Sequence, residues 1–77
     1  MTEHELDARG LLCPMPVIKT QTAIQQLPVG DHLKILATDP GVLHDIPAWC
    51  RVNGHKVLST DQADRDITVV IEVCEGD

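Results

Sequence analysis

Residues 67–73, Ile-Thr-Val-Val-Ile-Glu-Val, carry the clearest secondary-structure signal in the chain. Apolar side chains occupy every second position from Ile67 to Val73, which is the period of a strand with one buried face. Valine and isoleucine are also residues that favour strands over helices. The stretch therefore predicts a buried strand, and the rest of the chain must supply the strands and helices that pack with it.

The residues before this strand predict a sheet covered by helices. Pro47 is poorly tolerated inside a helix, so we expect the regular part of the second helix to begin near Asp45, acting as its N-cap. The order βαβαββ predicts an α+β fold in which both helices pack on one face of a single sheet. Hydrophobic periodicity and turn residues place these elements as strands at 3–9, 32–38 and 55–60, helices at 14–27 and 42–53, and a polar turn at 61–66.

Length and composition limit the classes of protein to consider. The chain has 77 residues, which predicts one domain over residues 1–77, and its 22 Val, Ile and Leu residues must form a core without Phe or Tyr. The net charge of −6 disfavours direct binding of nucleic acid through a basic surface. No apolar run approaches the length of a membrane span, and residues 1–12 contain no signal-peptide core. We expect a small cytoplasmic domain that does not bind membranes.

The three cysteines do not form a recognisable disulfide or metal pattern. Cys13, Cys50 and Cys74 are odd in number and widely spaced, and the chain has no CxxC motif. The histidines likewise have no spacing typical of metal ligands, so we expect no metal. Cys50 follows Trp49 on the apolar side of a helix and is expected in the core, whereas Cys74 is assigned no role.

Cys13 lies in the most informative segment, Gly10-Leu-Leu-Cys-Pro-Met-Pro16. Pro14 suits the first position of a helix, which would make Cys13 the N-cap. There its sulfur would face the N–H of Met15 and the positive end of the helix dipole, so we expect a mildly lowered pKa. Arg9 could add positive charge if the chain folds back. The segment predicts an exposed, reactive thiol.

The residue three positions after Cys13 limits the chemistry of this thiol. A thioredoxin-like site has a second cysteine there to resolve mixed disulfides, whereas this chain has Pro16. A persulfide on Cys13 would therefore meet no neighbouring thiol that could discharge it. This arrangement favours a protein that holds a sulfur atom until a partner takes it.

The chain resembles the TusA/SirA-like family of small sulfur carriers, which have a CPxP signature. The resemblance covers nearly the whole sequence. It rests on three segments, which are Leu6-Asp-Ala-Arg-Gly-Leu-Leu-Cys-Pro-Met-Pro16, then Thr38-Asp-Pro40, and then Asp45-Ile-Pro47 with Cys50 three residues later. A lone CPxP would be weak, but these segments at this spacing are specific.

The resemblance implies a fold, an activity and partners. The fold would be a two-layer sandwich with two helices on a four-stranded mixed sheet. The activity would be that of a sulfurtransferase acting as a persulfide relay, with Cys13 as nucleophile and no cofactor. From the local geometry and charge of the segment, we expect Pro14, Met15, Pro16 and Arg9 to support the thiol. The sulfur donor would be a cysteine desulfurase or a rhodanese, and the acceptor a DsrE-type or TusD-like protein. The pathway could be tRNA thiolation, cofactor sulfuration or dissimilatory sulfur oxidation.

A different class of function is also open on the sequence alone. The proline-bracketed helix end could be the docking surface of a non-catalytic interaction or regulatory module. Leu11, Leu12 and Met15 could form an apolar docking patch around the thiol, although we expect at least one of the leucines to pack beneath the helix. Acidic side chains could steer the chain toward a basic donor, although a solvated acidic face explains them equally; these are Glu3, Glu5, Asp7 and Asp39.

Overall fold

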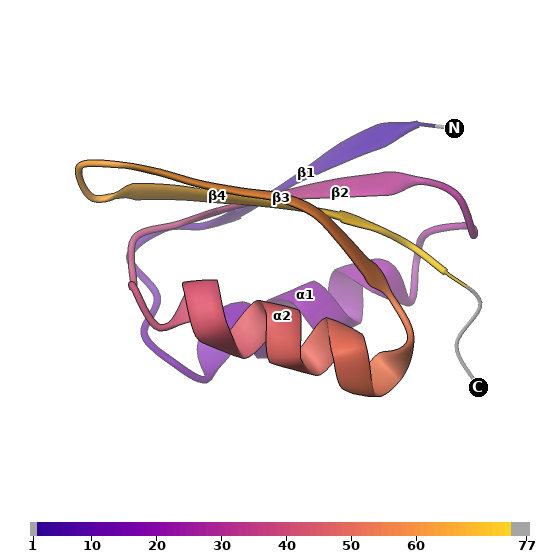
Figure 1. The fold of residues 1–77 in the computed structure, drawn as a ribbon, viewed down its shortest axis with the longest axis horizontal. Coiled ribbons are helices and arrows are strands. Elements are labelled where there is room, and N and C mark those ends of the chain that lie inside the picture. Colours follow the sequence, from indigo (N-terminus) through magenta and orange to yellow (C-terminus); the bar gives the residue numbers. More distant parts are fainter. Residues whose placement is uncertain (1, 75–77) are drawn as a thin grey trace.

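A computed structural model describes residues 2–74 as a two-layer sandwich of helices on a sheet. Both helices lie against the same face of the sheet (Figure 1). The longest, α2, has 12 residues, and no helix in residues 2–74 is long and apolar enough to cross a bilayer. The structure confirms the predicted α+β fold and element order, with bounds β1 (Glu3–Ala8), α1 (Met15–Ile24), β2 (His32–Ala37), α2 (Val42–Asn53), β3 (Lys56–Ala63) and β4 (Asp66–Glu72).

The four strands form one mixed sheet in the order β1-β2-β4-β3. β1 and β2 are parallel because α1 carries the chain back across the sheet between them, whereas β4 is antiparallel to both β2 and β3. Leu6 lies opposite Ile35, which lies opposite Val69, so a row of apolar residues crosses three strands. The strand with the clearest sequence signal, β4, is thus paired along both of its edges.

The core between the layers is aliphatic, as the composition predicts. Every second side chain of β2 and β4 is buried against the helices. Helix α2 contributes Val42, Ile46 and Cys50, each no more than 1% exposed. On α1 the buried Thr20 hydroxyl donates to the Pro16 carbonyl oxygen at 2.8 Å, so this polar group is satisfied inside the core. One buried stripe per helix fixes both helices on the same face.

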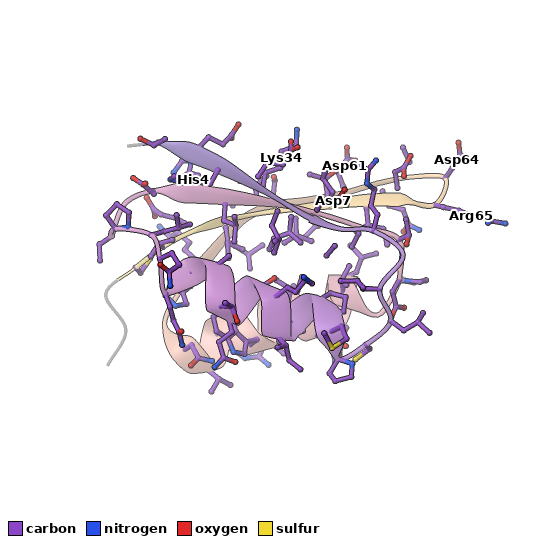
Figure 2. All side chains as sticks on the ribbon, turned by 180° about the vertical axis from the view of Figure 1, so that it is seen from behind. His4, Asp7, Lys34, Asp61, Asp64 and Arg65 are labelled. Carbon is purple, nitrogen blue, oxygen red and sulfur yellow. The ribbon has the colours of Figure 1, made fainter. Side chains whose placement is uncertain are left out.

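The sheet face away from the helices carries polar and charged side chains. Lys34 and Asp61 project from this face (Figure 2). Lys34 lies opposite Glu5 on the neighbouring strand, and the His32 Nε2 atom lies 3.7 Å from the Glu72 carboxylate. Polar and charged side chains therefore meet across neighbouring strands, which suits a face exposed to water.

Helix α2 spans the predicted range 42–53, but it is regular from its first residue rather than from Asp45. Its first residue is Val42, so the predicted start with Asp45 as N-cap is wrong and Pro47 lies inside the helix. The first amides of α2 find acceptors in the preceding loop, because the Val42 N–H donates to the Asp39 carbonyl at 3.1 Å and the Asp45 N–H to the Gly41 carbonyl at 2.8 Å. Proline removes one donor from this helix, and the packing of α2 on the sheet outweighs that loss.

The hairpin between β3 and β4 is longer and tighter than predicted. β3 extends to Ala63, and the turn is limited to Asp64 and Arg65, with a positive φ of 57° at Asp64. Residues 61–63 were expected in the polar turn, but they are exposed at the sheet edge and pair with β4 through their backbone. Their composition therefore reports solvent exposure rather than a turn.

Candidate functional site

Cys13 lies on the exposed loop that connects β1 to α1. The loop turns at Gly10, which has a φ of 81° and whose N–H donates to the Thr38 hydroxyl at 2.9 Å. At the other end of the loop, the Cys13 N–H donates to the Asp39 carboxylate at 2.8 Å. Two hydrogen bonds therefore hold the loop against the segment that follows β2, and the thiol projects from a fixed backbone.

The start of α1 differs from the prediction in a way that changes the environment of the thiol. The helix begins at Met15 and ends at Ile24, inside the predicted range 14–27, and Pro14 is its N-cap. The Met15 N–H, which we expected to face the sulfur, instead donates to the Leu12 carbonyl at 2.9 Å. The predicted N-cap cysteine is therefore wrong, because the helix amide is already paired within the loop.

The residues expected to support the thiol lie in different environments. Pro16 is fully buried and anchors the start of α1 in the core. Leu11 packs against the core, as expected for one of the two leucines. Leu12 and Met15 are exposed, by 74% and 42%, and Ile18 continues the exposed apolar surface along α1. The loop therefore presents an apolar border beside the thiol.

Two aspartates flank the other side of Cys13. The thiol donates to the Asp45 Oδ2 atom at 2.8 Å, so the first turns of α2 reach the loop between β1 and α1. Asp39 accepts the N–H of Cys13 through one oxygen and the N–H of Gly41, at 3.1 Å, through the other. These two bonds, that from Cys13 first, lower the pKa of Asp39 and keep it charged.

The surroundings of the thiol raise its pKa rather than lower it. The hydrogen bond to Asp45 is the largest cause, followed by partial desolvation and by the negative charges of Asp45 and Asp39. The expected mild lowering by a helix N-terminus is therefore wrong. The site therefore favours the protonated thiol of Cys13.

Arg9 does not supply the positive charge that the sequence allowed. Its guanidinium binds the Asp7 carboxylate through two hydrogen bonds, of 2.9 and 3.0 Å. This pairing lowers the pKa of Asp7 to about 2 and raises that of Arg9. Asp7 points away from the helices on the outer side of the sheet (Figure 2). The supporting role expected for Arg9 at the thiol is therefore not seen.

The other two cysteines are structural in their surroundings. Cys50 is 1% exposed in α2, as expected, and burial raises the pKa of its thiol to about 11. Cys74 is half-buried after β4, where its N–H donates to the His55 Nδ1 atom at 3.1 Å. Of the cysteines, Cys13 alone is exposed. Within residues 2–74, no three His, Cys, Asp or Glu side chains lie together as a metal site would require.

Asp39 and Asp45 are site residues that reasoning from the sequence missed. Asp39 was expected on an acidic surface and Asp45 as a helix cap, although both lie in the segments Thr38-Asp-Pro40 and Asp45-Ile-Pro47 that carry the family resemblance. That coincidence was the available signal. It could not show the role, because Cys13 and Asp45 are 32 residues apart and meet only through the docking of α2.

Comparisons with known proteins identify relatives of the chain. The family model of sulfurtransferase TusA matches residues 4–73. A provisionally named sulfur carrier protein of Neisseria meningitidis serogroup A is 39% identical over 72 residues, covering 94% of this chain and 97% of its own. Sulfur carrier protein TusA of Pseudomonas syringae is 45% identical over 57 residues, covering 74% and 68% of the two chains.

A solved structure has the same fold as this chain. The crystal structure of a SirA-like protein from Desulfitobacterium hafniense superposes with a TM-score of 0.81. The alignment covers 94% of this chain and 99% of that one at 24% identity. The architecture is thus shared where the sequences have diverged. With the family model spanning nearly the whole chain and the relatives matching along it, the chain belongs to the sulfurtransferase TusA family of sulfur carriers.

Proposed function

We propose that Cys13 accepts sulfane sulfur as a persulfide and passes it to a second protein. The observation that carries this proposal is the exposure of Cys13 on a loop held at both ends, while Cys50 is sealed in the core. An incoming sulfur-bearing group can reach only a thiol that is open to solvent. No second cysteine stands three residues on, so the loaded sulfur has no neighbouring thiol to release it.

The transfer step is an exchange between a thiol and a persulfide. The Cys13 sulfur, as its thiolate, attacks the outer sulfur of a donor persulfide, R–S–S–H. A bond forms between Sγ and that outer sulfur, while the donor's S–S bond breaks. The proton lost from Cys13 balances the thiol R–S–H that departs, so no oxidant or reductant is consumed. Delivery reverses the roles, with an acceptor thiolate attacking the outer sulfur and Cys13 leaving.

The surface beside Cys13 suits a protein partner at both steps. Leu12, Met15 and Ile18 are exposed beside the thiol or along the helix that follows it. A partner must cover this surface to bring its own sulfur within bonding distance. The donor in this proposal is a cysteine desulfurase or a rhodanese, and the acceptor is a DsrE-type or TusD-like protein. The pathway is tRNA thiolation, cofactor sulfuration or sulfur oxidation.

The deciding experiment measures where sulfur is retained. The intact protein is incubated with inorganic polysulfide, or with a persulfidated cysteine desulfurase, and its mass is determined without reductant. We expect one added sulfur atom that maps to Cys13 and disappears on reduction. Cys13→Ser should take up no sulfur and keep its circular-dichroism spectrum, since the side chain is exposed.

The competing function is a non-catalytic interaction module that uses the same exposed surface. That function requires Leu12 and its neighbours but not the sulfur atom. If Cys13→Ser still supports the wild-type activity in cells, or if added sulfur maps to another cysteine, the persulfide proposal is wrong. Cys74→Ser is the matched control, because it removes a thiol that is only half exposed and should leave sulfur uptake unchanged.

A further inference from the structure

The thiol of Cys13 makes the one side-chain hydrogen bond that joins its loop to α2 within the described residues. The donated proton points at the Asp45 Oδ2 atom, with sulfur and oxygen 2.8 Å apart. Asp45 lies at the start of α2, whose inner face is buried against the sheet, and its side chain is half-buried. The contact therefore connects the reactive loop to a rigid part of the fold.

Loading with sulfur removes the proton on which this contact depends. In the persulfide, Sγ is bonded to Cβ and to the outer sulfur, and any proton sits on the outer sulfur. The outer sulfur lies about 2.05 Å beyond Sγ. Sγ then presents only lone pairs to the Asp45 carboxylate, and a lone pair facing an anion is repulsive. The short contact between Sγ and Asp45 cannot survive in the loaded form.

We propose that Asp45 senses whether Cys13 carries sulfur. In the sulfur-free carrier its hydrogen bond to Cys13 holds the reactive loop against α2. When sulfur is bound, this hydrogen bond is lost and the loop is released. This inference rests on the proposed persulfide on Cys13. It assigns Asp45 a positioning role in the cycle, because the loop that a partner meets is held differently before and after loading. Donor and acceptor proteins can then distinguish an empty carrier from a full one by a contact that the sulfur itself controls.

The hydrogen bond to Asp45 also protects the thiol of the sulfur-free carrier from reaction. Asp45 and Asp39 are the charged groups that act on the Cys13 sulfur, and both disfavour the thiolate. Because the thiolate is the nucleophile and the form that is oxidised, the empty carrier reacts slowly with small electrophiles. Removing the Asp45 charge should therefore raise the reactivity of Cys13.

The first test follows alkylation of Cys13 by iodoacetamide against pH, with the modified peptide identified by mass spectrometry. One charge about 4 Å away in water changes an ionisation equilibrium by about fivefold. We expect Cys13 in Asp45→Asn to react about fivefold faster at neutral pH, with the pH profile of its alkylation rate moved to lower pH. Asp45→Glu should restore part of the protection.

The control is Asp61→Asn, which removes the same charge from the outer face of the sheet and should react like the wild type. Equal rates for Asp45→Asn and wild type would overturn the guarding role.

The second test compares loop protection in the empty and loaded protein by amide hydrogen exchange. Methyl methanethiosulfonate converts Cys13 to a methyl disulfide, which removes the thiol proton and adds one outer sulfur, and polysulfide gives the persulfide itself. We expect both forms to exchange faster than the empty protein at the amides of Leu12 and Cys13, and Asp45→Ala to match them without any modification. Unchanged exchange in a chain shown by mass to be loaded would overturn the inference while leaving the persulfide proposal intact. Failure of Cys13 to load from any donor would instead remove the proposed function.

Discussion

Leu12 directly precedes Cys13, the proposed sulfur-carrying residue, and 74% of its surface is exposed. Burying such a side chain against a partner contributes about 1.5–3 kcal/mol, enough to change an affinity by about tenfold to a hundredfold. We expect Leu12→Ser to slow sulfur transfer from a persulfidated donor protein through a higher KM. Loading by inorganic polysulfide should be unchanged, since that donor needs no docking surface. Rates of sulfur uptake, measured by intact mass at several donor concentrations, check this.

Val52 provides the control for Leu12. It is 81% exposed, but it lies in the last turn of α2, whereas Asp45, which contacts the thiol, lies near the start of that helix. Seven helical residues separate the two positions by about 10 Å. Val52→Ser makes the same change from apolar to polar and should leave transfer from the donor protein as it was. A similar slowing in both variants would count against docking beside Cys13.

Cys50 tests whether burial alone separates a structural thiol from a reactive one. Its side chain packs among the aliphatic residues of the core at 1% exposure. Cys50→Ser places a hydroxyl in this apolar site and should lower the free energy of unfolding by about 1–3 kcal/mol. Sulfur uptake at Cys13 should be retained in the folded fraction. Urea unfolding followed by circular dichroism gives the first quantity, and loss of uptake by the folded protein would assign Cys50 a part in the chemistry.

At the scale of elements, Pro47 is a local defect in α2. It occupies a position where the helix would otherwise have an N–H donating to the carbonyl four residues earlier. Pro47→Ala supplies that donor, and the gain should exceed the added flexibility of the unfolded chain, which costs about 0.4–1 kcal/mol. We expect the free energy of unfolding to rise by about 1 kcal/mol or more. A fall in stability would mean that the proline ring contributes packing worth more than the missing hydrogen bond.

The elements also show what a single sequence can and cannot predict. β4 was clear because its alternation continues through seven residues, and both helices were recognised from apolar spacing. The N-cap expected at Asp45 within α2 and the end expected for β3 were wrong, because proline and polar residues signal helix and strand ends only on average. In both places tertiary packing overrides the local preference.

The candidate site, like the fold, was predictable from the sequence only in part. An exposed Cys13 followed by two prolines could be predicted, because adjacent residues determine it. The hydrogen bond from Cys13 to Asp45, the raised pKa of the thiol and the pairing of Arg9 with Asp7 could not. The first two depend on which end of α2 meets the loop, and the third on a local geometry that places the guanidinium along β1 rather than over the sulfur.

At the scale of the whole molecule, His55 joins the elements at the end of the fold away from the start of α2. Its ring stacks on Trp49 with centroids 5.3 Å apart, and its Nδ1 atom accepts the N–H of Cys74 after β4. Accepting that bond requires the neutral ring, with its proton on Nε2. Burial lowers the pKa of His55, so the folded protein binds a proton there less readily than the unfolded chain does.

The sign of the resulting pH dependence follows from this lowered pKa. The contribution of His55 is fully present above the unfolded pKa of about 6.5 and is lost as the pH falls from there through the lower folded value. The free energy of unfolding should therefore decrease between pH 7.5 and 5.5, measured in urea with the fluorescence of the chain's single tryptophan.

The control variant is His55→Asn, whose amide oxygen can still accept the N–H of Cys74 but does not titrate. The decrease in the free energy of unfolding with falling pH should therefore be smaller in this variant. Loss of the stack on Trp49 lowers its stability at every pH and does not affect this comparison. The other histidines are common to both chains and cancel in the comparison. The same decrease in His55→Asn as in the wild type would show that His55 does not couple this end of the fold to pH.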